Sequence, residues 1–96
     1  MRLKHNVSLL GMKPEIVVGM MAAQEVCREL GVDLILTSVT DGKHSKGSRH
    51  YSGLAFDMRT RHMKDPKDAH RRLSEALGEQ FDVVLESTHI HVEYDP

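Results

Sequence analysis

The stretch GSRHYSGLAFD, residues 47–57, joins a polar segment to an apolar one. Residues 40–53 (TDGKHSKGSRHYSG) are dense in Gly, Ser, Lys and His and have no periodicity, which predicts a surface loop. Residues 54–60 (LAFDMRT) read as a strand in which Phe56 and Asp57 point to opposite faces. The stretch therefore predicts a long loop that delivers polar side chains to the start of a strand.

Outward from this stretch, two helices are expected. Apolar residues at steps of three and four predict an amphipathic helix over Pro14–Leu30, with Gly31 placed to end it. Asp65 can cap a second helix that begins at Pro66 and ends near Gly78.

Three further segments read as strands. Residues 32–39 are apolar and rich in β-branched side chains, and residues 81–87 and 89–94 are separated by a turn short enough for a hairpin. Helices and strands do not alternate regularly, so the fold class expected is α+β, with a small, mostly antiparallel sheet packed against two helices.

Composition limits the function classes. The 96 residues predict a single domain spanning 1–96, and a formal net charge of −1 provides no basic surface for nucleic acid. No apolar run approaches the roughly 18 residues that a membrane span needs. Cys27 is the only cysteine, so a metal site in this chain would use nitrogen and oxygen ligands.

A second group of histidines lies near the C-terminus, in HIHVE (residues 89–93). On a strand, His89 and His91 project from the same face, which by itself is also typical of solvent-exposed histidines on an edge strand. Together with His50 and Asp57, however, they give four candidates for the three protein ligands of a catalytic zinc site, which leaves one position for water.

The same residues carry a family resemblance. SRHYSGLAFD has the pattern S-x-H-x-x-G-x-A-x-D, and HIH follows in the expected order. The chain from Thr37 onward thus resembles the zinc metallopeptidases that include D-alanyl-D-alanine carboxypeptidases, phage endolysin peptidases and the zinc domain of hedgehog proteins. TDGKHSKGSRHYSG and ESTHIHV are especially similar to hedgehog domains, so a hedgehog- or DD-peptidase-like fold is expected.

The resemblance implies His50, Asp57 and His91 as ligands of Zn2+. It also implies Glu86 as the general base, with His89 and His44 as groups beside the metal ligands. Glu86 is three residues before His89 and five before His91, so a reading of the motif as E-x-x-H would make His89 the third ligand instead. The H-x-H spacing favours His91.

The remaining predicted roles concern substrate binding and the oxyanion. Ser48 and Arg49 are candidates for binding substrate, and Ser48 is also expected to make a hydrogen bond next to the ligands. His44, His89 or Arg49 could donate to the oxygen that becomes negative when an amide is attacked. Cations expected near a substrate carboxylate are Arg49, Arg59, Lys43 and Lys46.

The function that the resemblance implies is zinc-dependent hydrolysis of an amide bond in bacterial cell-wall stem peptides, either as a D-Ala-D-Ala carboxypeptidase or as a murein endopeptidase. The partner would be a peptidoglycan stem peptide. The start of the chain has no recognisable signal peptide, so synthesis in the cytoplasm and action on the wall after release are expected.

Two other functions fit the same residues. The protein could be a non-catalytic, hedgehog-like zinc module that binds a partner, and a site closed by both His89 and His91 would favour that alternative. A cytosolic dipeptidase is less favoured, because few segments remain to wall off a pocket against longer peptides.

Overall fold

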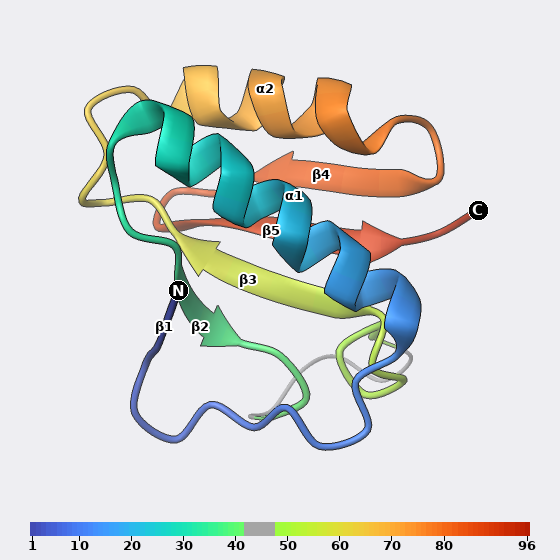
Figure 1. Cartoon of the computed structure of the whole chain (residues 1–96). Coiled ribbons are helices and arrows are strands. Elements are labelled where there is room, and N and C mark those ends of the chain that lie inside the picture. Colours follow the sequence, from blue (N-terminus) through green and yellow to red (C-terminus); the bar gives the residue numbers. More distant parts are fainter. Residues whose placement is uncertain (42–47) are drawn as a thin grey trace.

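The computed structural model describes residues 1–41 and 48–96 of the chain. The described residues form five strands and two helices in the order β1 (Arg2–Leu3), α1 (Pro14–Leu30), β2 (Ile35–Ser38), β3 (Ala55–Arg59), α2 (Pro66–Leu77), β4 (Phe81–Leu85) and β5 (His89–Tyr94). The fold is a small α+β fold with a mostly antiparallel sheet and two helices, as the sequence predicts (Figure 1).

The strands form one sheet in the order β1-β2-β3-β5-β4. All neighbouring strands are antiparallel except β1 and β2, which are parallel. β1 was not predicted, because its two residues are exposed and belong to the sheet only through pairing with β2. β5 was predicted as a hairpin partner of β4, and it also lies next to β3 in the centre of the sheet.

Both helices begin and end where the sequence predicts. α1 has Pro14 in its first turn and ends at Gly31, whose φ of 72° is left-handed. The carboxylate of Asp65 accepts a hydrogen bond from the backbone N–H of Asp68 at 3.3 Å and so caps α2.

The core lies between the helices and one face of the sheet (Figure 1). Alternate strand residues such as Phe56, Met58, Ile90 and Val92 are fully buried there, together with Ile16 and other apolar residues of the helices. The residues between them on β3 and β5 point to the opposite face, which neither helix covers. That second face carries the predicted site.

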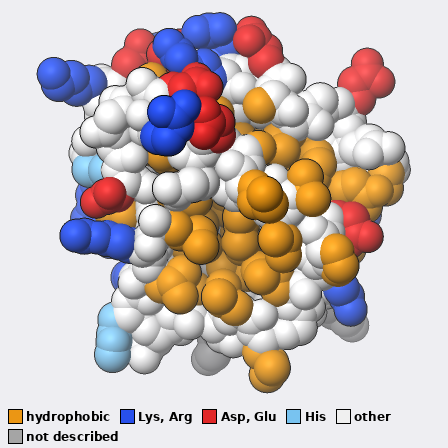
Figure 2. Space-filling model, in the orientation of Figure 1, with side chains coloured by type: hydrophobic (Ala, Val, Ile, Leu, Met, Phe, Trp, Pro, Cys, Tyr) orange, Lys and Arg blue, Asp and Glu red, His pale blue; other side chains and the backbone are white. Residues whose placement is uncertain are grey.

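The helix-bearing side has an apolar outer surface. Figure 2 shows hydrophobic side chains gathered over the middle of this side. Val18 and Met21 on α1 are 58% and 67% exposed, and Leu10 in the segment before α1 is 86% exposed. This apolar surface and the predicted site therefore belong to opposite sides of the sheet.

Candidate metal centre

The turn of residues 48–54 positions the first predicted ligand, His50. Backbone hydrogen bonds from Gly53 to His50 (3.1 Å) and from Leu54 to Arg49 (2.9 Å) make this turn compact. The backbone N–H of Lys13, just before α1, donates to the carbonyl of Gly53 at 3.0 Å. The turn is thus tied to the helix layer, and His50 is only 2% exposed.

The other two predicted ligands come from adjacent strands. Asp57 of β3 and His91 of β5 are direct partners in the ladder, so their side chains project from the same face. Asp57 Oδ1 lies 2.9 Å from His91 Nδ1 and 3.3 Å from His50 Nε2. The two imidazole rings have centroids 5.1 Å apart.

These three residues could hold a metal ion. Each offers one ligand atom, and the three atoms lie within 4.8 Å of one another. Two imidazole nitrogens and one carboxylate oxygen form a donor set that suits zinc and leaves room for a further ligand in tetrahedral geometry. The chemistry of the residues present therefore fits a metal site with one position left for a further ligand.

The outer nitrogen of each imidazole is already engaged. His50 Nδ1 lies 2.7 Å from the carbonyl of Val39, which can only accept, so this nitrogen donates to it, and Nε2 faces Asp57. His91 Nε2 lies 2.8 Å from Glu93 Oε1 and donates to that carboxylate. Hydrogen bonds of this kind orient ligand histidines in metal sites, and here they aim Nε2 of His50 and Nδ1 of His91 inward.

The electrostatics of the group match this arrangement. Burial acts to raise the pKa of Asp57, but hydrogen bonds from His50 and His91 and the nearby imidazoles outweigh it, so the pKa lies well below its ordinary value. The hydrogen bond to Asp57 raises the pKa of His91, with burial opposing and Glu93 adding to the effect. Asp57 is thus held ionised, as a metal ligand must be.

His89 lies beside the group without joining it. Its Nε2 is 3.9 Å from Asp57 Oδ1, a full 1.0 Å longer than the distance from His91, and its Nδ1 is 3.1 Å from the hydroxyl of Thr88. The geometry therefore favours His91 as the third ligand and leaves His89 as a neighbour of the site.

Glu86, the predicted base, follows β4 directly. Its backbone N–H donates to the carbonyl of His89 at 2.8 Å, and it lies two residues beyond Val84, the ladder partner of His91. Strand alternation therefore directs Glu86 toward the face that carries His50, Asp57 and His91. Glu86 is exposed and belongs to neither of the two groups of described residues that could hold an ion.

The remaining predicted residues have mixed outcomes. The hydroxyl of Ser48 accepts a hydrogen bond from the backbone N–H of His50 at 3.2 Å, which supports the turn. Arg49 donates to Asp95 at 2.9 Å and lies 4.0 Å from Glu93, so C-terminal acids already engage its charge. His44, Lys43 and Lys46 lie outside the described residues.

Sequence reasoning gave Glu93 no role. The signal was present, because Glu93 follows His91 by two residues and so shares its strand face. What the pattern could not show is that its carboxylate would meet the outer nitrogen of His91.

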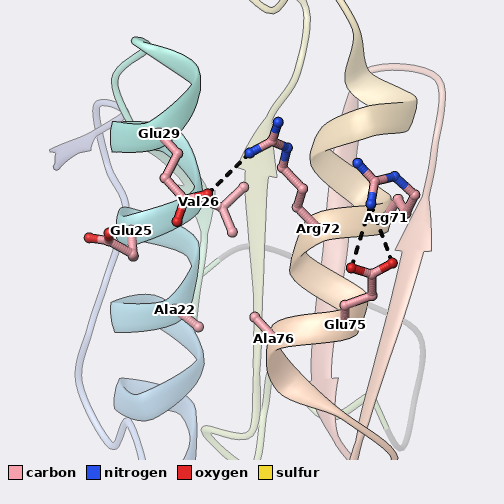
Figure 3. A pocket seen from close by; sticks show the side chains of 8 residues that line it. All are labelled: Ala22, Glu25, Val26, Glu29, Arg71, Arg72, Glu75 and Ala76. Atoms are coloured by element: carbon pink, nitrogen blue, oxygen red, sulfur yellow. Dashed lines mark hydrogen bonds and ion pairs between the residues drawn. The ribbon is translucent and has the colours of Figure 1, made fainter.

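A cavity of about 520 Å³ also lies between α1 and α2. Figure 3 shows Arg72 of α2 reaching Glu29 of α1, and Arg71 pairing with Glu75. Glu25 pairs with an arginine of its own helix. Because every charged residue that lines this cavity has a partner, it offers a ligand no free charge.

In the part of the chain described here, no helix has both the length and the apolar character needed to cross a membrane. A scan of the sequence against protein-family models finds no matching family, and searches of curated proteins and of solved structures find no match.

Proposed function

We propose that this protein is a zinc-dependent peptidase that hydrolyses an amide bond in bacterial cell-wall stem peptides. The observation that supports zinc binding is the convergence of His50, Asp57 and His91, with both imidazoles oriented by hydrogen bonds on their outer nitrogens. The peptide substrate rests on the resemblance of SRHYSGLAFD and HIH to zinc metallopeptidases.

The residues divide the chemistry as follows. Bound zinc supplies a Lewis acid that lowers the pKa of a water molecule to about 7 and polarises a carbonyl. Glu86 takes a proton from the attacking water and passes it to the leaving nitrogen as the C–N bond breaks. His89, beside Asp57, donates to the oxygen that becomes negative when the water adds.

The first test is metal content. We expect about one zinc ion per chain in the wild type, by elemental analysis, and a loss of zinc in His50→Ala and Asp57→Ala because each removes one of three ligands. His5→Ala is the matched control, since His5 is exposed and lies far from the motif in sequence. Full zinc occupancy in Asp57→Ala would refute the ligand assignment.

The second test is hydrolysis. Peptidoglycan fragments incubated with the wild type should yield a new product in mass spectrometry, whereas Glu86→Ala should retain zinc and lose about 100-fold or more in rate. Glu79→Ala removes another exposed glutamate and should leave the rate unchanged. Near-normal hydrolysis by Glu86→Ala would exclude Glu86 as the base.

One observation favours the alternative of a non-catalytic zinc module. Glu86 is exposed and stands outside the residues that could share an ion, so the carboxylate that distinguishes an enzyme from a structural site is not held in place by the described residues. Zinc at one ion per chain, with no product from any stem peptide, would support this alternative.

A further inference from the structure

A groove adjoins the metal centre on the uncovered face of the sheet. It has a volume of about 330 Å³, and Asp57 and His89 form one part of its lining. Thr37 of β2 and Arg59 of β3 continue the lining, and Lys4 and Arg61 complete it from the segments that follow β1 and β3. A ligand in this groove would therefore contact both the metal centre and three cationic side chains.

The two arginines of the groove, Arg59 and Arg61, differ from the other arginines of the protein, each of which is ion-paired. Carboxylates of the two helices pair with Arg28, Arg71 and Arg72. Asp95 pairs with Arg49. Within residues 1–41 and 48–96, Lys4, Arg59 and Arg61 form no ion pair. The acidic residue in the groove lining is Asp57, whose carboxylate is already in contact with His50 and His91.

The spacing limits where an anion would sit on a substrate. Arg59 is two residues beyond Asp57 on β3, which places their backbones about 7 Å apart. A residue of extended peptide spans about 3.5 Å, so a carboxylate bound at Arg59 would lie one or two residues from a carbonyl at the metal centre. A guanidinium can bind such a carboxylate through two parallel hydrogen bonds.

We propose that this groove is an anion subsite in which Arg59, aided by Arg61 and Lys4, binds a substrate carboxylate close to the scissile amide. This proposal rests on the proposed peptidase function and narrows its substrate class to peptides that carry a carboxylate within two residues of the cleaved bond. It also reassigns substrate recognition from Arg49, whose charge is engaged by Asp95, to Arg59.

The test measures binding, so it does not depend on turnover. N-acetyl-D-alanine is titrated into the full-length protein as purified, and backbone amide signals of Thr37 and Thr88 are followed by NMR, with N-acetyl-D-alaninamide as the uncharged probe. We expect saturable shifts with the carboxylate, binding at least about tenfold weaker for the amide, and a similar loss for Arg59→Gln. Equal binding of both probes, or wild-type binding by Arg59→Gln, would overturn the proposal.

Two further variants separate a lost subsite from a lost fold. Arg61→Gln and Lys4→Gln alter exposed side chains, and combined they should weaken carboxylate binding while leaving the melting temperature unchanged. Lys67→Gln removes an exposed cation on α2, outside the groove lining, and should bind the carboxylate like the wild type. Equal weakening in Lys67→Gln would show a general charge effect and overturn the proposal.

The source of the carboxylate is resolved with substrates. Stem peptides that end in a free carboxylate are compared with their C-terminal amides, and peptides with a free acidic side chain are compared with the side-chain amide. If amidation raises the wild-type KM in only one of these two comparisons, and does not raise it in Arg59→Gln, the carboxylate that was amidated is the one that Arg59 binds. If no peptide is cleaved but N-acetyl-D-alanine still binds through Arg59, the peptidase function fails while the anion site stands.

Discussion

At the scale of single residues, Glu93 is the feature that a motif would not reveal. Its carboxylate accepts the Nε2 proton of His91 at 2.8 Å, and so holds the ring with Nδ1 toward Asp57. Glu93 is 24% exposed in its side chain and also lies 4.0 Å from Arg49. A carboxylate in this position makes the imidazole a stronger ligand and limits its rotation.

We therefore expect Glu93→Gln to weaken zinc binding by about 10- to 100-fold, measured by competition with a chelator of known affinity. The neutral amide can still accept the hydrogen bond, but it no longer increases the basicity of the ring. Glu79→Gln, which alters an exposed acid, is the control and should bind zinc like the wild type. Unchanged affinity in Glu93→Gln would show that His91 needs no support from Glu93.

Cys27 belongs to the core and takes no part in the site. It is fully buried, and burial raises the pKa of its thiol to about 11. Since the thiolate is the reactive form, we expect iodoacetamide at pH 8 to leave the native protein unlabelled and to label it rapidly in urea, as read by mass spectrometry. Rapid labelling without urea would contradict this burial.

The raised thiol pKa of Cys27 also makes the stability of the fold depend on pH. Between the ordinary thiol pKa and the raised value of about 11, the unfolded chain loses a proton that the folded chain keeps. The contribution of Cys27 to stability is therefore fully present below this window and declines as the pH rises through it.

At the scale of elements, the turn before β3 depends on Gly53. Its φ of 74° is left-handed, and a Cβ at this position would lie 2.1 Å from the carbonyl oxygen of Gly11. The two backbone segments therefore pass too closely for any side chain. This contact, with the hydrogen bond from Lys13 to the Gly53 carbonyl, holds the turn that carries His50.

We expect Gly53→Ala to lower the free energy of unfolding by about 2 kcal/mol or more, measured by urea titration. Gly31→Ala is the matched control, because Gly31 has a similar φ of 72° but no atom within 4 Å of the added Cβ. Gly31→Ala should lower the free energy of unfolding by about 1 kcal/mol, the cost of a left-handed backbone conformation at a residue that has a Cβ. Equal losses in the two variants would show that the contact with Gly11 is unimportant.

At the scale of the whole molecule, the candidate metal centre joins parts of the chain that are distant in sequence. His50 comes from the turn, Asp57 from β3 and His91 from the C-terminal strand. A small domain has a limited core, so an ion that binds only the folded arrangement should add noticeably to its stability.

Zinc at about 100 times its dissociation constant should stabilise the fold by about 2.7 kcal/mol, which corresponds to a rise of roughly 10 to 20 °C in melting temperature for a domain of this size. Calorimetry with and without a chelator measures this shift. Asp57→Ala should melt at the same temperature in both conditions. A wild-type melting temperature that does not respond to zinc would argue against a site formed by these three segments.

The sequence by itself determined the features that depend on local pattern. Both helices follow from apolar periodicity and from their Pro, Asp and Gly ends, and the shared face of His89 and His91 follows from the twofold repeat of a strand. The pattern around His50 and Asp57 likewise predicted three residues that the structure brings together.

Only the tertiary structure decided the register and the charge partners. Burial of Phe56 opposite Val92 and of Met58 opposite Ile90 places Asp57 opposite His91, whereas His89 is opposite Arg59. A shift of one residue would turn the apolar side chains to the uncovered face, so packing of the core determines which residues form the candidate metal centre. Residues far apart in sequence also meet: Arg49 pairs with Asp95, and Lys4 shares one groove with Arg59 and Arg61. The order of the strands brings these residues together, and no local sequence pattern contains that order.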